Sequence, residues 1–204
     1  MLIVGLTGSI GMGKSAVAAR FREHGIAVFD ADAEVHRLYR GPAAHLIEAA
    51  FPGTTNASGV DREKLAQSLN LDATSFKRLE AIVHPLVWQA ERDFLQATLA
   101  SGARIAILEI PLLFEGGNDT KLDAVVVASA RAEVQRKRVL ERAGMTDKKL
   151  DSLLARQLPD VEKRRRADFV VDTNGSMAET HAQTDVIIGK LRDRPAQAFA
   201  QYWI

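Results

Sequence analysis

The feature that most constrains this chain is a glycine-rich string near its first residue. Residues 8–15 read Gly-Ser-Ile-Gly-Met-Gly-Lys-Ser, which matches the G-x-x-x-x-G-K-[ST] pattern of a phosphate-binding loop. The apolar run Leu2–Leu6 before it predicts a buried strand, and Ala16–His24 after it predicts a helix closed by Gly25. A strand before and a helix after are the context that this loop requires. The string therefore predicts a protein that binds ATP or GTP.

The residue types in the string have physical reasons. Gly8, Gly11 and Gly13 let successive backbone N–H groups turn inward around phosphate oxygens, where a Cβ would clash. The helix that begins near Lys14 adds its positive end. Lys14 supplies a charge for the β- and γ-phosphates, and the Ser15 hydroxyl is a ligand for Mg²⁺. The residues expected to bind the nucleotide are Gly11, Met12, Gly13, Lys14, Ser15 and Ala16.

Composition narrows the class of protein without identifying it. The 204 residues suit one α/β domain with inserted segments. The net charge of +1 gives no electrostatic case for binding nucleic acid or an anionic membrane, and no cysteine is present for disulfides or thiolate metal sites. No stretch approaches the ~20 apolar residues of a membrane span, and the first apolar run is too short for a signal peptide. We therefore expect a cytoplasmic protein, either a monomer or a small homo-oligomer.

Short apolar runs alternate with helical patterns along the chain. This alternation predicts an α/β fold, with helices on both faces of a five-stranded parallel sheet in the three-layer arrangement of P-loop nucleotide-binding proteins. The runs expected to form the strands are Leu2–Leu6, Ile26–Phe29, Ile105–Ile110, Ala124–Ala128 and Phe169–Val171.

A long insertion separates the second and third predicted strands. It spans about seventy residues, far more than a crossover needs, so we expect a helical subdomain there. Within it, Thr54–Gly59 is predicted to be a polar loop. The apolar stripe over Phe76–Val83 predicts a helix that Pro85 breaks or kinks. His84, just before Pro85, either faces a substrate or caps a helix.

A second insertion follows the fourth predicted strand. Ser129 is expected to cap a helix over Ala130–Ala143, and a second helix is expected over Asp147–Leu158. Arg138 and Arg142 fall on one face of the first helix. Guanidinium groups stabilise the charge that spreads over a transferring phosphoryl group. This face is therefore either a solvated surface or part of a lid of the kind that P-loop kinases carry.

Carboxylates follow two of the predicted strands. Ligands of open α/β folds bind beyond the carboxyl ends of the strands, and Asp30 and Asp32 stand directly after the second strand. A carboxylate there can orient an attacking hydroxyl and accept its proton, or hold Mg²⁺ through water. Alternatively both cap the helix over Ala33–Tyr39; we expect one of them to do so and Asp32 to be functional. Glu109 and Glu115 frame the end of the third strand, either near Mg²⁺ or as solvated charges.

Other strings allow more than one interpretation. The basic run Lys163–Arg166 either touches a nucleotide phosphate or forms a solvated helix face. Thr120–Asp123 and Asp172–Gly175 look like guanine-reading and switch motifs of GTPases, but their order and their places relative to the strands are wrong. We interpret both as coincidence, which weakens the hypothesis of a nucleotide-dependent switch.

A series of segments carries a more specific resemblance. In this order and spacing they resemble the dephospho-CoA kinase family over essentially the whole chain. The segments are Leu6–Ser15, Asp30–Asp32 with His36, Val60–Arg62, Ile82–Val87, Pro111–Glu115, Ala167–Asp172 and Asn174–Gly175.

The resemblance implies transfer of the γ-phosphoryl group of ATP, with Mg²⁺, to the ribose 3′-hydroxyl of dephospho-CoA. By matching position, Asp32 would be the base, and Thr7 and His84 would lie in or near the acceptor site. Arg138 or Arg142 would act from the lid. It also implies three parts, which are a nucleotide-binding core over 1–32, 103–129 and 160–204, an acceptor subdomain over 33–102 and a lid over 130–159.

The chain departs from the family pattern at a few positions. Ser9 replaces a usual glycine, and Met12 stands where a small residue is common. The lid keeps Gln157, but Leu153 stands where many members carry arginine. Arg156 is a candidate replacement for that arginine. The identity of the arginine that stabilises the transferring phosphoryl group therefore stays open. The nearest alternative function is a kinase of similar architecture that acts on a nucleoside monophosphate or on shikimate.

Overall fold

A computed structural model describes residues 1–69 and 73–204 of the chain. Its centre is a five-stranded sheet with the strand order β2-β5-β1-β6-β7, and the β1–β5, β1–β6 and β6–β7 pairs are parallel. The predicted α/β class and all five strands are confirmed, with ends that differ by one residue. The strands are β1 (Leu2–Thr7), β2 (Ala27–Asp30), β5 (Ile105–Glu109), β6 (Ala124–Ser129) and β7 (Phe169–Asp172).

The described chain divides into two compact units. The first comprises Met1–Phe29 and Leu95–Ile204, and the second comprises Asp30–Phe94. No helix in the described ranges is long and apolar enough to cross a membrane.

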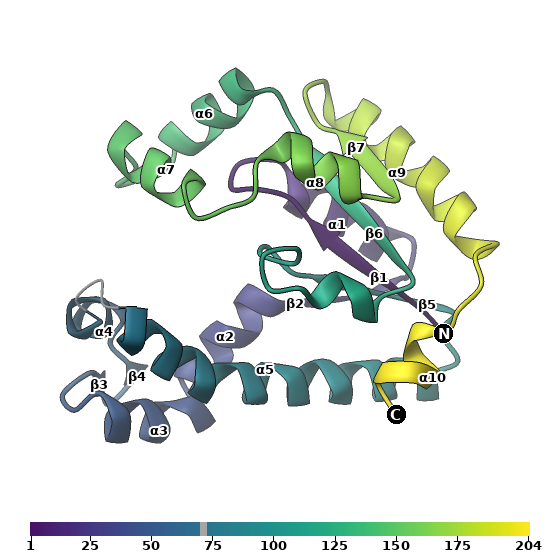
Figure 1. The fold of residues 1–204 in the computed structure, drawn as a ribbon. Helices are drawn as coiled ribbons and strands as arrows, with labels where there is room; N and C mark the ends of the chain where they lie inside the picture. Colours follow the sequence, from purple (N-terminus) through teal and green to yellow (C-terminus); the bar gives the residue numbers. More distant parts are fainter. Residues whose placement is uncertain (70–72) are drawn as a thin grey trace. The chain divides into compact units, whose positions relative to one another are not determined.

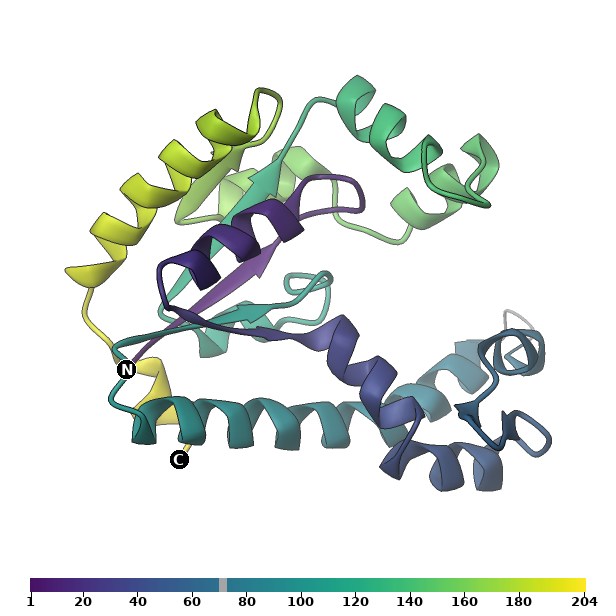
Figure 2. The same ribbon diagram turned by 180° about the vertical axis from the view of Figure 1, so that it is seen from behind.

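Helices cover both faces of the sheet in the first unit. The helices α1 (Lys14–Glu23) and α9 (Met177–Arg192) lie together on one face, and α8 (Asp160–Arg166) lies on the other (Figures 1 and 2). The remaining elements of this unit are α6 (Ala132–Leu140), α7 (Asp147–Leu154), α10 (Ala198–Tyr202) and the short 3₁₀ helix η1 (Asn118–Lys121).

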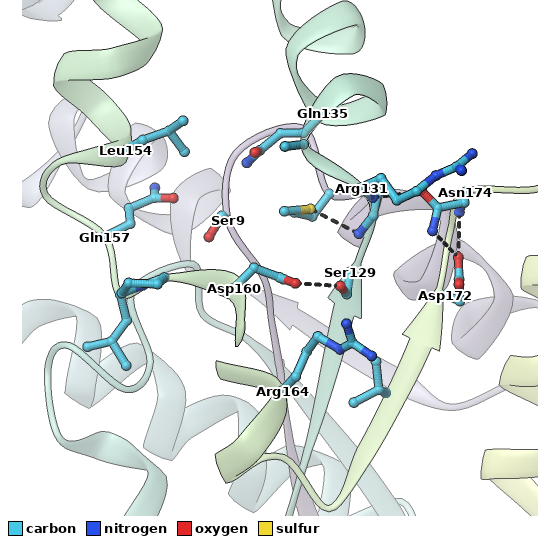
Figure 3. Close-up of a pocket in the computed structure, with 16 residues that line it drawn as sticks. Ser9, Ser129, Arg131, Gln135, Leu154, Gln157, Asp160, Arg164, Asp172 and Asn174 are labelled. Carbon is cyan, nitrogen blue, oxygen red and sulfur yellow. Dashed lines mark hydrogen bonds between the residues drawn. The ribbon is translucent and has the colours of Figure 1, made fainter. Parts of the chain in front are cut away.

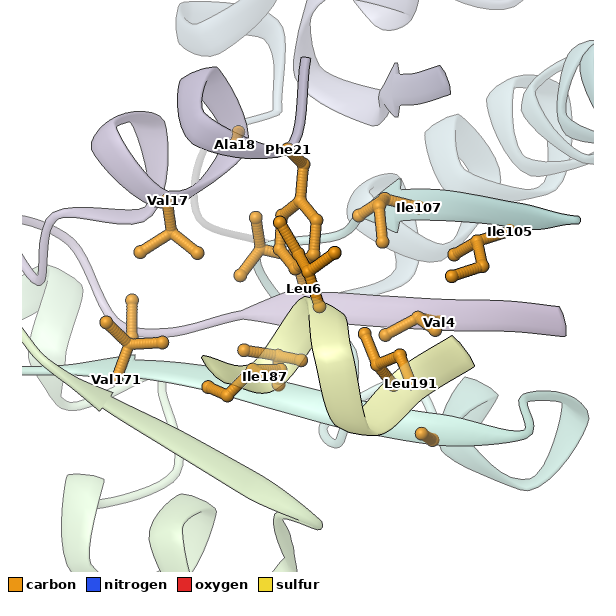
Figure 4. Close-up of a cluster of buried hydrophobic side chains, with 14 of the residues drawn as sticks. Val4, Leu6, Val17, Ala18, Phe21, Ile105, Ile107, Val171, Ile187 and Leu191 are labelled. Carbon is orange, nitrogen blue, oxygen red and sulfur yellow. The ribbon is translucent and has the colours of Figure 1, made fainter. Parts of the chain in front are cut away.

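The main core lies between the sheet and the α1–α9 pair (Figure 4). Phe21 of α1 and Val4 and Leu6 of β1 are completely buried there, and Ile187 and Leu191 of α9 close the cluster. Each such side chain contributes about 1.5–3 kcal/mol when it is fully removed from water. This packing fixes α1, the helix that begins at the glycine-rich string.

An ion pair joins the same two helices at their solvent edge. Arg20 donates to both carboxylate oxygens of Asp185 at 2.7 Å, and His24 Nε2 lies 2.8 Å from Asp185 Oδ1. The hydrogen bonds from Arg20 lower the pKa of Asp185 to about 2. Asp185 is therefore ionised at neutral pH and holds α1 against α9.

The second unit is mainly helical, with its own core around Ile47, Leu65 and Val83. A two-stranded hairpin is formed by Thr55–Asn56 and Gly59–Val60. It overlaps the polar loop that was predicted over Thr54–Gly59. Its strands are too short to show an alternating apolar pattern. The elements of this unit are α2 (Ala31–Tyr39), α3 (Pro42–Ala50), β3 (Thr55–Asn56), β4 (Gly59–Val60), α4 (Arg62–Ser68) and α5 (Ala73–Ala100), which continues into the first unit.

The predicted break at Pro85 does not occur, because α5 is one helix of 28 residues with Pro85 inside it. A proline inside a helix costs about 3 kcal/mol through a lost hydrogen bond and a steric clash. Apolar side chains on both sides of Pro85 pack into the same core, among them Phe76, Leu79, Val83 and Leu86. Their burial outweighs the local cost of the proline.

Candidate functional site

The glycine-rich string forms a loop between the end of β1 and the start of α1. Gly11 and Gly13 have φ values of 77° and 84°, in the left-handed region that glycine tolerates best. Gly13 is the N-cap of α1 and offers no side-chain cap, so the positive end of the helix dipole faces the loop without a capping side chain. Lys14 Nζ donates to the Gly8 carbonyl oxygen at 2.8 Å. Ser15 is exposed in the first turn.

The outer side of the loop is packed against protein. A Cβ on Gly11 would lie 2.5 Å from Val139 Cγ2, and one on Gly13 would lie 2.9 Å from Thr173 Oγ1. Met12 is buried, and its sulfur accepts a hydrogen bond from the Ala130 backbone N–H at 3.0 Å. The glycines are therefore required by packing on the outer side of the loop.

Arg138 is bonded to the segment that follows β7. Its guanidinium donates to Thr173 Oγ1 at 3.0 Å and to the Thr173 carbonyl oxygen at 2.5 Å. Thr173 Oγ1 in turn donates to the Met12 carbonyl oxygen at 2.9 Å. Arg142 differs, because it is exposed beyond the end of α6 and its side chain has no partner in the described parts of the chain.

The expected cap at Ser129 is wrong, because α6 begins at Ala132 and Arg131 occupies the N-cap position. Ser129 ends β6, and its hydroxyl donates to Asp160 Oδ2 at 2.7 Å. Both residues line a cavity of about 550 Å³ beside the loop (Figure 3). The backbone N–H of Arg131 donates to Asn174 Oδ1 at 2.7 Å on the same wall.

The walls of the cavity combine apolar surface with side chains of both charges. Its walls come from the glycine-rich loop, the end of β6, α6, the segment after α7, and α8. Asp160 Oδ1 is buried without a hydrogen-bond partner among the described residues, and the guanidinium of Arg164 lies in the same wall (Figure 3). Such walls suit a ligand that has an apolar face as well as hydrogen-bonding groups.

A buried ion pair holds the segment that returns from α7. Lys163 Nζ lies 2.8 Å from Glu115 Oε1, and the Lys163 side chain is completely buried. The backbone N–H of Leu158 donates to the same Glu115 oxygen at 2.7 Å. Burial acts to raise the pKa of Glu115, but the hydrogen bonds from Lys163 and Leu158 outweigh it and hold the pKa below its usual value.

This pair corrects two expectations. Glu115 is not a solvated loop charge, because its carboxylate binds Lys163. The run Lys163–Arg166 is not a uniform solvated face either, since its first residue is buried while Arg165 and Arg166 are exposed and pair with Glu162. Sequence reasoning had no signal for this, because a lysine in a basic run usually faces water.

We expect Lys163→Met to lower the free energy of unfolding by about 3 kcal/mol, because it leaves the Glu115 carboxylate buried without its partner. For a chain of this size that corresponds to a fall in Tm of about 6–12 °C, measurable by calorimetry at pH 7. The deficit shrinks as the pH falls, because the unpaired buried carboxyl of the variant takes up a proton before the wild-type carboxyl, whose pKa the Lys163 pair holds below its usual value.

The matched control is the double variant Lys163→Met/Glu115→Gln. The amide that replaces the carboxylate keeps an acceptor for the Leu158 N–H and carries no charge, so more than half of the lost Tm should return. A double variant no more stable than Lys163→Met would contradict a stabilising role for this pair.

The two aspartates after β2 have different surroundings. Asp30 is the N-cap of α2, and its side chain accepts a hydrogen bond from the Ala33 backbone N–H at 2.9 Å. The expectation that one of the two caps this helix is confirmed. Asp32 lies in the first turn of α2 and is exposed, and its carboxylate has no partner within the described residues.

The remaining predicted site residues are placed as follows. Thr7 is completely buried, and its hydroxyl donates to the Pro111 carbonyl oxygen at 3.1 Å. His84 is exposed on α5, with its ring centroid 6.0 Å from that of Trp88. Glu109 is buried at the end of β5 rather than solvated.

Comparison with known proteins agrees with this architecture. The model of the family "Dephospho-CoA kinase" matches residues 2–179. Curated relatives of that name from Rhizobium etli and Nitrobacter winogradskyi are 55% and 52% identical, over 97% and 96% of this chain and 97% and 98% of theirs. A solved structure, TT1252 from Thermus thermophilus, aligns with a TM-score of 0.80 at 34% identity, over 93% of this chain and 97% of that one. The chain belongs to the dephospho-CoA kinase family.

Proposed function

We infer that this chain transfers the γ-phosphoryl group of ATP to the ribose 3′-hydroxyl of dephospho-CoA, giving coenzyme A and ADP, the final step of coenzyme A biosynthesis. The observation that carries this inference is the 55% identity to a curated dephospho-CoA kinase over nearly the full length of both chains. The intact phosphate loop supports it, because phosphoryl transfer needs such a cradle. We expect the enzyme to act in the cytoplasm on small molecules.

The loop supplies the nucleotide site in this proposal. In this proposal backbone N–H groups of the loop, that of Gly11 among them, face the phosphate oxygens, and Lys14 exchanges its bond to Gly8 for the β- and γ-phosphates. The exposed Ser15 hydroxyl is a hard oxygen donor of the kind Mg²⁺ prefers. When bound, Mg²⁺ would be held by Ser15 and would neutralise charge on the phosphates.

Asp32 is the proposed group that acts on the acceptor hydroxyl. Its carboxylate is exposed, whereas Asp30 is committed to capping α2. A carboxylate is a weak base for an alcohol, so we assign it mainly to orienting the hydroxyl, with the proton accepted late. Thr7 and His84 are proposed to lie near the acceptor, as the family pattern implies.

We propose Arg142, in preference to Arg138, as the arginine that stabilises the charge of the transferring phosphoryl group. Arg138 is held by two hydrogen bonds to Thr173, so it is better placed to hold the phosphate loop than to reach a transferring group. Arg142 is exposed, and its guanidinium has no hydrogen-bond or ion-pair partner among the described residues. The guanidinium fork suits phosphoryl oxygens.

The acceptor is tested by ADP release from ATP with Mg²⁺, measured with dephospho-CoA and separately with AMP and with shikimate. Fast release with dephospho-CoA alone supports the proposal. Release with AMP or shikimate instead would assign the chain to another acceptor, and ATP binding without release in any arm would favour a nucleotide-dependent switch.

A further inference from the structure

Two glutamines bind the backbone of one residue in the phosphate loop. Gln135 Nε2, on α6, donates to the Ile10 carbonyl oxygen at 2.8 Å. The Ile10 backbone N–H donates to Gln157 Oε1, in the segment after α7, at 3.2 Å. We propose that Gln135 and Gln157 are positioning residues, which orient the peptides on either side of Ile10 so that the loop is ready for phosphate before nucleotide arrives.

The geometry of the peptide bond supplies the reason. In a trans peptide the C=O and the following N–H point in opposite directions. When Gln135 holds the Ile10 carbonyl outward against α6, the Gly11 N–H must point into the loop, where phosphate binds. When Gln157 holds the Ile10 N–H outward, the Ser9 carbonyl points in the opposite direction. The Ser9 carbonyl oxygen accepts a hydrogen bond from the Met12 N–H at 3.2 Å.

Glycine makes this restraint necessary. Gly11 has a φ of 77° and can adopt a wide range of backbone conformations, so the peptide between Ile10 and Gly11 can flip at low cost. A flipped peptide would direct a carbonyl oxygen at the phosphates and would remove one N–H donor. Preorganised donors avoid that cost when the ligand binds.

Each glutamine is itself held in place. Gln135 is only 6% exposed and lies one turn before the completely buried Val139, so most of its side chain is shielded from water. Gln157 precedes Leu158, whose N–H is fixed by Glu115 and through it by Lys163. The two helices at the base of the predicted lid are thereby tied to the phosphate loop.

The test uses ADP and the β,γ-imido analogue of ATP, each with Mg²⁺ and without acceptor. The inference rests on the proposed function only in that the chain binds nucleotide. Because no acceptor is added, a wrong assignment of the acceptor substrate cannot affect the result. Gln135→Met removes the donor at nearly equal length. We expect it to raise Kd for both nucleotides about tenfold and to shrink the shift of the Gly11 amide resonance on ADP addition. Gln157→Met should act in the same direction.

Gln183→Met is the matched control. Gln183 also holds both backbone groups of one residue, accepting from the Asp172 N–H at 2.9 Å and donating to its carbonyl oxygen at 2.8 Å. We expect Gln183→Met and Gln135→Met to lower Tm by similar amounts. The Kd for nucleotide should change less than about twofold in Gln183→Met. Unchanged Kd in Gln135→Met, or an equal rise in both variants, would overturn the positioning role.

Discussion

Asp32→Asn is expected to lower kcat about 10²- to 10⁴-fold, the range attributed to a positioned acid–base group. Asparagine keeps the size of the side chain and removes its negative charge, so the acceptor hydroxyl loses its orienting partner and its proton acceptor. KM for ATP should change less than about threefold, because the proposed site for the nucleotide phosphates is the loop and not Asp32. Steady-state kinetics with ATP and dephospho-CoA measure both.

Asp30→Asn is the control for the same chemistry two residues away. Asp30 caps α2 through its side chain, and asparagine caps helices as well as aspartate does. We therefore expect near-normal kcat and Tm. If Asp32→Asn keeps near-normal kcat, or if Asp30→Asn loses as much, Asp32 has no special role in the transfer.

Lys14→Met should reduce kcat/KM about a thousandfold, as expected for removal of a charge that neutralises the transferring phosphoryl group. Most of the loss should fall on kcat, since charge on the leaving phosphate grows in the transition state. Stopped-flow or steady-state ADP release measures it, with ADP affinity measured separately.

Lys190→Met removes an exposed lysine from α9 and controls for the change in net charge. We expect it to leave kcat/KM within about twofold and Tm unchanged. A Lys14→Met enzyme with kcat/KM within tenfold of the wild type would mean that this loop does not stabilise the transfer.

The sheet could be predicted because each strand leaves a strong local signal. Buried parallel strands contact protein on both faces, so Ile105–Glu109 and Ala124–Ser129 appear as continuous apolar runs. The phosphate loop was equally clear, because only glycine tolerates its positive φ values. Asp30 and Asp32 could be found from their place at the end of a strand, but their spacing does not reveal which carboxylate accepts the Ala33 N–H.

The errors arose where contacts between distant residues decide the structure. Pro85 stays inside α5 because of core packing that a local pattern does not record. Ser129 looks like a helix cap but binds Asp160, which lies 31 residues away in the sequence. The burial of Lys163 likewise depends on Glu115, which lies in the segment after β5.

The contacts of Gln135 had one local signal. A glutamine one turn before Val139 on the buried side of α6 is unusual, since a buried amide needs partners. Its partner, the Ile10 carbonyl oxygen, lies 125 residues away. The sequence therefore indicates that Gln135 must bind something, and only the fold shows that the partner belongs to the phosphate loop.

Transfer to the ribose 3′-hydroxyl of dephospho-CoA is tested most directly by the ³¹P NMR spectrum of the purified product, made with γ-labelled ATP and Mg²⁺. The proposed function predicts one new phosphomonoester on the ribose 3′-oxygen, carrying the label, in amounts equal to the ADP formed. Label in inorganic phosphate alone, or in a phosphate at another position, would contradict it.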